Sequence, residues 1–152
     1  MGTPSRFDDG STLSWNGAGV PRTVGGDAGL TFSLRDAKGE PLTVTPYLGM
    51  AAHAVVVKVD GSVFVHLHPS GSASMGAQQA LEAWTPADTV RGAIRDRLER
   101  ARDAMAMSHN ELPAEFSFPY AFPSAGQYRV WVQLRHRRAI RSAAFDVSVG
   151  DR

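Results

Sequence analysis

Two β-rich runs flank an Asp-Gly pair near the middle of the chain, and this feature constrains the fold more than any other. The runs are residues 53–59 and 62–68, and Asp60-Gly61 lies between them. Asp-Gly between such runs is the strongest short-range signal for a β-hairpin. Pro69 ends the second run because proline cannot donate to a strand ladder. The sequence therefore predicts a hairpin over residues 53–68.

Three further segments alternate apolar and polar residues with the period of two that marks a strand. They are residues 30–34, 128–134 and 143–149. A turn at residues 136–139 would join the last two segments as a second hairpin. Its register predicts the pairs Tyr128 with Val147, Val130 with Phe145, Val132 with Ala143, and Arg129 with Asp146.

Weaker signals add strands at the ends of this set. A short strand is expected at residues 12–15, and an edge strand at residues 116–122, where Pro119 and Pro123 interrupt the alternation. Tyr128 follows a loop near the start of its strand. Its position predicts the corner of an immunoglobulin-like sandwich, in which the tyrosine hydroxyl turns back onto the preceding loop.

One region has the pattern of a helix instead. Thr85 is a good N-cap and Pro86 a good first helical residue. Apolar residues then recur at helical spacing, which predicts a helix over residues 86–107. A shorter helical turn is expected before it, so that the helical insertion covers about residues 77–108.

The length and composition of the chain indicate a single domain. The chain has 152 residues, of which 43% are hydrophobic, with 15 glycines and 9 prolines. With the strand pattern and the tyrosine corner, we expect a mainly β domain, an immunoglobulin-like β-sandwich of about seven strands with one inserted α-helix. Residues 1–29 are predicted to be a flexible N-terminal segment with a possible first strand, and residues 30–149 to be the sandwich.

Composition also excludes several function classes. The net charge is only +1, which argues against nucleic-acid binding, and the chain has no cysteine for disulfides or thiolate metal sites. No apolar run is long enough for a membrane span, and residues 1–9 are too polar for a signal peptide. The chain also lacks a Gly-x-Ser-x-Gly elbow, a phosphate loop and a paired carboxylate couple, so catalysis is not predicted.

The predicted hairpin places three histidines on one face. Counting outward from Asp60-Gly61, Val55 faces His66 and His53 faces His68. Residues directly opposite one another point to the same side of a sheet. His53, His66 and His68 should therefore form a compact triangle at the open end of the hairpin.

Such a triangle is suited to a metal ion. Imidazole binds copper, zinc, nickel and iron, and a thioether ligand shifts the preference toward copper. Met50 lies just before the hairpin and Met75 shortly after it. We therefore expect copper as the cofactor, with zinc a weaker candidate, and metal ligands at His53, His66, His68, Met50 and Met75.

A structural role for the same histidines is the alternative. Val55, Val57 and Phe64 share the histidine face, which predicts that this face is partly core. The histidines would then be rim residues bonded to backbone, or a metal site would lie at the rim, half in the core and half open.

Several pieces of the chain resemble a known family. They are residues 47–56, which contain Gly49-Met50-x-x-His53, then His66-Leu67-His68-Pro69, then Phe118-Pro119 and residues 126–132. Together they are similar to bacterial extracytoplasmic YtkA-like, cupredoxin-like or immunoglobulin-like domains associated with copper handling. The resemblance spans about residues 30–149, and the stretch 84–109 fits it least well.

The resemblance implies a periplasmic or extracellular domain that binds copper for sequestration or transfer and is not an enzyme. Such a domain would be exported, with the signal or membrane anchor outside this sequence. It implies metal ligands at the same three histidines and at Met50 and Met75, and a metallochaperone or membrane-protein partner. The alternative is an immunoglobulin-like structural or protein-interaction module of a membrane-associated assembly, with no metal.

Two further features of the sequence each have a functional and a simpler structural explanation. Met105, Met107 and His109 could form a second soft-metal cluster, or could be a helix end where a cation near the last carbonyls is favourable. The basic run 135–141 could contact an anionic partner, but a solvated hairpin tip is the more common role.

Overall fold

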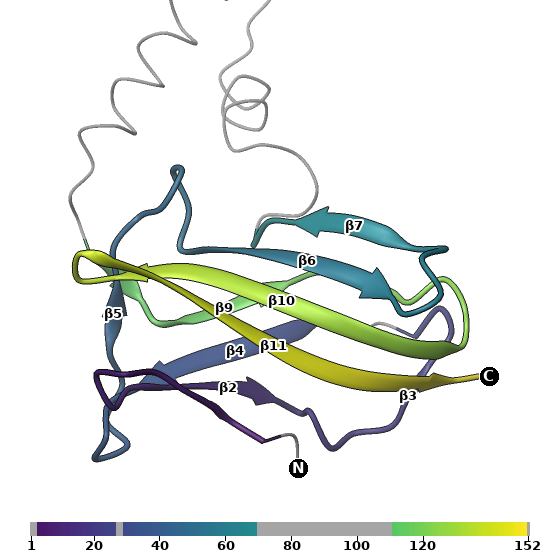
Figure 1. The fold of residues 1–152 in the computed structure, drawn as a ribbon, viewed down its shortest axis with the longest axis horizontal. Coiled ribbons are helices and arrows are strands. Elements are labelled where there is room, and N and C mark those ends of the chain that lie inside the picture. Colours follow the sequence, from purple (N-terminus) through teal and green to yellow (C-terminus); the bar gives the residue numbers. More distant parts are fainter. Residues whose placement is uncertain (1–2, 27–28, 70–110, 152) are drawn as a thin grey trace, which may run out of the picture.

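A computed structural model describes residues 3–26, 29–69 and 111–151. Within these ranges the chain forms two main β-sheets and one small strand pair (Figure 1). The four-stranded sheet has the order β1 (Ser5–Arg6), β2 (Thr12–Asn16), β4 (Leu30–Arg35) and β9 (Glu115–Phe118). The five-stranded sheet has the order β3 (Arg22–Thr23), β11 (Ala139–Gly150), β10 (Gly126–His136), β6 (Ala52–Lys58) and β7 (Phe64–Leu67). The small pair is β5 (Thr43–Val44) with β8 (Leu112–Pro113).

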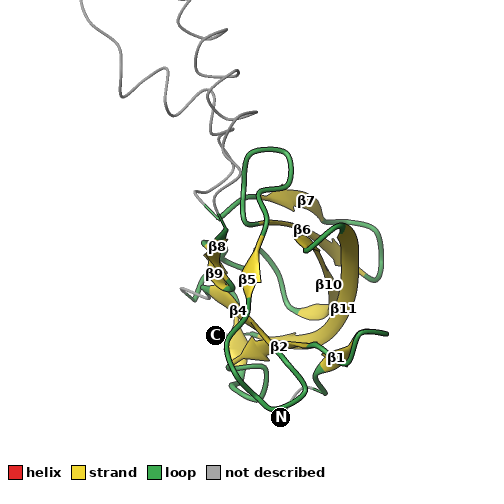
Figure 2. Cartoon of the chain, turned by 90° about the vertical axis from the view of Figure 1, so that its left-hand side faces the viewer, coloured by secondary structure: helices red, strands yellow, loops and turns green. Residues whose placement is uncertain are grey.

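The two main sheets face each other across one apolar core. Figure 2 shows β6, β10 and β11 on one side of it and β2, β4 and β9 on the other. Aromatic side chains join the layers: the rings of Phe32 on β4 and Phe145 on β11 have centroids 5.2 Å apart, and Trp15 on β2 meets Phe145 edge-on at 6.2 Å. The mainly β prediction is therefore confirmed, with a sandwich-like arrangement of sheets.

The β10–β11 hairpin has the predicted register. Tyr128 pairs with Val147 and Val130 with Phe145, and all four side chains are buried. On the opposite face Arg129 pairs with Asp146, and its guanidinium donates to both carboxylate oxygens at 2.7 and 2.8 Å. The alternation and the turn at residues 136–139 were together sufficient here, because each strand has one mainly apolar and one mainly polar face.

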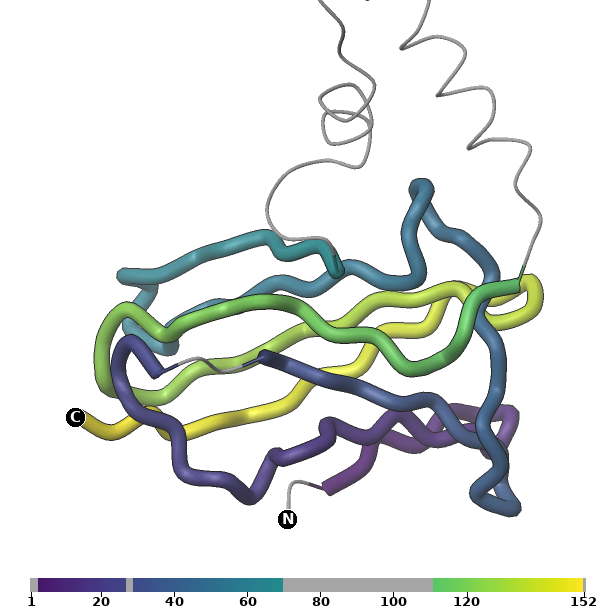
Figure 3. The backbone as a smooth tube through the Cα atoms, turned by 180° about the vertical axis from the view of Figure 1, so that it is seen from behind, coloured from purple at the N-terminus to yellow at the C-terminus, as the bar shows by residue number. Residues whose placement is uncertain are grey.

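The N-terminal residues belong to the core. β2 pairs with β4 along its whole length, and it buries Leu13 at 0% exposure and Trp15 at 6%. β9 lies on the other side of β4, so segments far apart in the sequence are neighbours in this sheet (Figure 3). The four-stranded sheet therefore begins at Ser5 and includes strands from the segment predicted to be flexible. Among the described strands β9 lies at the edge of its sheet, as predicted, and it ends at Phe118, directly before Pro119.

The tyrosine corner is also present. The Tyr128 hydroxyl donates to the Ser124 carbonyl oxygen at 2.8 Å, and the tyrosine is 1% exposed. This bond fixes the loop that enters β10. The predicted helical insertion, residues 77–108, lies outside the described residues.

Candidate metal centre

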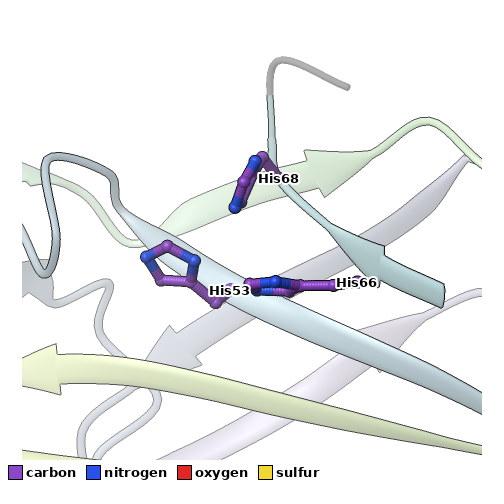
Figure 4. A group of neighbouring side chains, drawn as sticks. All are labelled: His53, His66 and His68. Carbon is purple, nitrogen blue, oxygen red and sulfur yellow. The ribbon is translucent and has the colours of Figure 1, made fainter. Parts of the chain in front are cut away.

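Three of the five histidines of the chain meet on one face of the β6–β7 hairpin (Figure 4). His53 lies on β6, His66 on β7, and His68 directly after β7. The ring centroids are 5.5 Å apart for His53 and His66, 5.1 Å for His53 and His68, and 4.8 Å for His66 and His68. One nitrogen atom of each ring lies within 4.8 Å of the other two. The predicted triangle is confirmed, and we call it the histidine cluster.

The register of the hairpin comes from its turn. Lys58 N–H donates to the Val63 carbonyl at 2.9 Å, which closes a four-residue loop, and Val55 then pairs with His66. Gly61 has φ +79°, a conformation that glycine adopts without a Cβ penalty. Asp60 accepts hydrogen bonds from the hydroxyl and the N–H of Ser62. These bonds lower the pKa of Asp60 to about 2, and the bond from the Ser62 hydroxyl has the larger effect.

The histidine cluster lies on the outer face of the sheet. The prediction that Val55, Val57 and Phe64 make this face part of the core is wrong, because Phe64 is 73% exposed and Val55 and Val57 are only half-buried and do not pack against the core. The core is formed by the other face of β6, whose residues Ala52, Ala54 and Val56 are at most 1% exposed. Both faces of β6 are apolar, so hydrophobicity could not indicate which one is buried.

His53 is nevertheless buried, at 7% exposure. The Tyr47 ring covers it edge-on, with centroids 5.6 Å apart. Its Nε2 lies 2.9 Å from the Tyr47 carbonyl oxygen. A carbonyl can only accept, so Nε2 carries the hydrogen and donates. In the neutral ring this leaves Nδ1 as the atom with a free lone pair.

The surroundings of His53 favour this neutral form. Burial lowers the pKa of the His53 imidazole below its ordinary 6.5. The nearby His68 and His66 lower it further, and the bond to Tyr47 opposes them. A neutral imidazole is the form that binds a metal ion.

A tight turn holds the Tyr47 carbonyl in position. The backbones of Tyr47 and Met50 exchange hydrogen bonds of 2.8 and 3.2 Å around Leu48 and Gly49. Leu48 has φ +50° and Gly49 φ +82°, the two positive values of a type I′ turn. The Arg135 guanidinium lies 5.3 Å from the Tyr47 ring centroid and supports the turn from β10. A metal-binding histidine usually donates its second ring nitrogen to such a carbonyl, which fixes its tautomer.

Two nitrogen atoms of the cluster are buried without a hydrogen-bond partner among the described residues. They are Nδ1 of His53 and Nδ1 of His68. Leaving a buried polar atom unpaired costs roughly 1–3 kcal/mol. An ion bonded to these atoms would remove that cost.

The three rings fit an ion after a small adjustment. Metal–nitrogen bonds of about 2.0–2.1 Å require donor atoms that are about 3.3–3.6 Å apart. The present limit of 4.8 Å between ring nitrogens therefore has to shorten by roughly 1 Å. Rotation of exposed His66 and half-exposed His68 can supply this movement without disturbing the core.

Of the two methionines predicted as ligands, the structure describes only Met50. Met50 is buried at 6% exposure in the turn that supports His53. Met75 and the predicted second cluster of Met105, Met107 and His109 lie outside the described residues. Ligand roles for Met50 and Met75 stay predictions.

Sequence reasoning missed several residues around the cluster. Gln133 pairs with His53 and Trp131 with Val55, both through the contact between β6 and β10. These strands are far apart in the sequence, so no local pattern could pair them. Tyr47 lies in the segment that resembles the family, but only the turn at residues 47–50 shows that its carbonyl contacts His53. Trp131 is on the outer face of β10 and is 46% exposed.

Comparisons with known proteins add one family. No helix among the described residues is both long and apolar enough to cross a membrane. No curated protein and no solved structure shows a significant match to the chain. Residues 5–151 match the family described as Domain of unknown function (DUF8832). Because the match covers nearly the whole sequence, the chain belongs to this family.

Proposed function

We propose that this chain is a metal-binding domain that holds one transition-metal ion between His53, His66 and His68. The observation that carries the proposal is the histidine cluster itself, with ring nitrogens within 4.8 Å of one another. Two of those rings present buried nitrogen atoms with no described partner. A third support is the hydrogen bond from His53 to the Tyr47 carbonyl, which fixes the tautomer of the neutral His53 ring.

Copper is the ion we propose first, with zinc as its competitor. Imidazole donors suit both metals, and the affinity of a given site for divalent ions is highest for Cu²⁺. Among the described residues the cluster contains no carboxylate, which disfavours calcium and magnesium. Met50 or Met75 would complete a softer site suited to Cu(I).

We infer a role in sequestration or transfer of the ion, without catalysis. Among the described strands β7 is the outermost of its sheet, and His66 is exposed, so a partner can exchange ligands without opening the core. The Tyr128 corner supports an immunoglobulin-like classification of the sandwich. The domain would act outside the cytoplasm with a metallochaperone or membrane-protein partner.

Calorimetric titration of the untagged full chain with Cu(II) and Zn(II) tests the proposal. We expect one ion per chain, with Cu(II) bound more tightly. His66→Ala removes an exposed ligand and should weaken binding by more than about 100-fold, since loss of an outer-sphere partner alone weakens metal sites by 10–100-fold. Met50→Leu should leave Cu(II) binding largely intact and weaken Cu(I).

His136→Gln is the matched control. His136 is also buried, at 6% exposure, but it lies at the end of β10 and its Nδ1 bonds to the Thr43 carbonyl at 2.7 Å. This variant should bind metal like the wild type. Equal affinity of the wild type and His66→Ala would contradict the proposal and favour the interaction module.

A further inference from the structure

A cavity of about 370 Å³ opens beside the histidine cluster, on the same outer face of the sheet. We call it the outer pocket. Its lining residues come from β6, β7, β10 and β11, and they are His53, Ala54, Val55, His66, Trp131, Val132, Gln133 and Ser142. Pockets that bind small molecules usually have volumes of about 300–1,000 Å³. The outer pocket is therefore large enough for a small organic molecule.

One side of the outer pocket is a polar row. His53 on β6 pairs with Gln133 on β10, which pairs with Ser142 on β11. The Gln133 side-chain amide donates to the Ser142 hydroxyl oxygen at 3.2 Å. A glutamine amide nitrogen carries two N–H groups, so a second one is left for a ligand oxygen. Neighbouring strands are about 4.7–4.9 Å apart, so the row extends roughly 10 Å away from the cluster.

The other side of the outer pocket is mostly apolar. His66 on β7 pairs with Val55 on β6, which pairs with Trp131 on β10. The Trp131 side chain is 46% exposed although it is a large hydrophobic group. The Arg129 guanidinium lies over this ring, 6.0 Å from its centroid, and the rest of the exposed ring surface is suited to an aromatic or other planar ligand.

The histidine cluster borders the outer pocket at one end, through His53 and His66. Metal sites with three protein ligands usually keep a further position for water or an exogenous ligand. A carboxylate suits this open coordination position, because one of its oxygens can bind the ion while the other accepts a hydrogen bond from the Gln133 side-chain amide. An inorganic anion would leave the Trp131 face without a contact.

We propose that the outer pocket binds a small planar organic carboxylate. One carboxylate oxygen coordinates the ion held by the histidine cluster, and the body of the molecule lies against Trp131. This inference rests on the proposed metal-binding function. It adds the chemical class of a second ligand for the same ion.

The experiment uses the untagged full chain loaded with Cu(II), and benzoate as the probe. Calorimetry measures affinity, and electron paramagnetic resonance reports a change in the copper ligands. Benzamide, which has the ring without the charge, and acetate, which has the charge without the ring, are the ligand controls. Benzoate should change the copper spectrum and bind about tenfold more tightly than either control.

Variants assign the binding to the outer pocket. Trp131→Leu should weaken benzoate binding about tenfold and leave acetate binding unchanged. Gln133→Glu puts a negative charge beside the proposed carboxylate and should weaken both. Phe64→Ala is the control, because Phe64 is exposed on the same hairpin and does not line the outer pocket.

The outcomes separate this inference from the proposed function. Failure of the chain to bind copper would overturn both. Copper binding that depends on His66, with a spectrum that benzoate does not change, would overturn the outer pocket alone. Equal benzoate affinity of the wild type and Trp131→Leu would also overturn it.

Discussion

At the scale of residues, the hydrogen bond from His53 to the Tyr47 carbonyl determines which nitrogen atom can bind a ligand. The bond uses Nε2, at 2.9 Å, and leaves Nδ1 of the neutral ring with a free lone pair for a ligand. Spacing in the sequence placed His53, His66 and His68 on one face, because the hairpin turn is a local signal. It could not give the tautomer, because the Tyr47 carbonyl is positioned by a separate turn.

The depressed pKa of His53 gives the metal-free chain a pH-dependent stability. Because burial lowers the folded-state pKa below 6.5, the unfolded chain binds more protons between the two values. The His53 contribution is therefore complete above pH 6.5 and is lost as the pH falls toward the folded-state pKa. Urea unfolding at pH 8 and pH 5 should show a larger loss for the wild type than for His53→Gln, which cannot titrate. The same loss in both proteins would contradict the assignment.

Tyr128 gives a second prediction at this scale. Its hydroxyl donates to the Ser124 carbonyl in a buried corner, so Tyr128→Phe should lower the free energy of unfolding by about 1–2 kcal/mol. The Tyr120 hydroxyl is buried without a partner among the described residues. Tyr120→Phe is therefore the control, and urea unfolding should find it neutral or slightly stabilising. Equal losses in the two variants would refute the corner bond as a stabilising contact.

At the scale of elements, local and distant pairings differ in how well sequence predicts them. The β6–β7 and β10–β11 hairpins have the predicted registers, because each is fixed by a short turn and an alternating pattern. The pairing of β6 with β10 joins segments that are separated by residues 59–125, and no local signal specifies it. Gln133 and Trp131 reach the histidine cluster only through that pairing, so they could not be predicted.

The Tyr47–Met50 turn allows a direct test of its support for His53. Gly49→Ala introduces a Cβ at φ +82° and should destabilise the chain by about 1–2 kcal/mol. Leu48→Gly, the matched change at φ +50° and 72% exposure, should be neutral or stabilising. Only Gly49→Ala should also weaken metal binding, which calorimetry would measure. Unchanged affinity in Gly49→Ala would show that the turn does not support the site.

At the scale of the whole molecule, the sandwich supplies a rigid outer face on which the histidine cluster is assembled. The general β architecture was predictable, because the alternating strands each have one clear apolar face. Which face of β6 is buried was not predictable, because both faces are apolar. The packing of β2, β4 and β9 against the five-stranded sheet decides between them. The histidine cluster is consequently more open than its apolar neighbours suggested.

Metal binding at this site should stabilise the entire domain, because the unfolded chain does not hold the three histidines together. An ion at 100 times its dissociation constant should add about 2.7 kcal/mol to the free energy of unfolding. Urea unfolding with Zn(II), and again after adding a chelator, measures this increment. The increment should be absent in His66→Ala, and its persistence there would place the stabilising ion elsewhere.

Nitrogen-15 NMR of the imidazole rings tests the central claim most directly, because it reports each histidine separately. Zn(II) is a suitable probe because it is diamagnetic. With one equivalent of Zn(II) added to the full chain, the account predicts shifts for His53, His66 and His68, with the change at His53 on Nδ1. The signals of His136 should stay where they are. Shifts confined to His109 or His136, or no shift in the histidine cluster, would contradict the account.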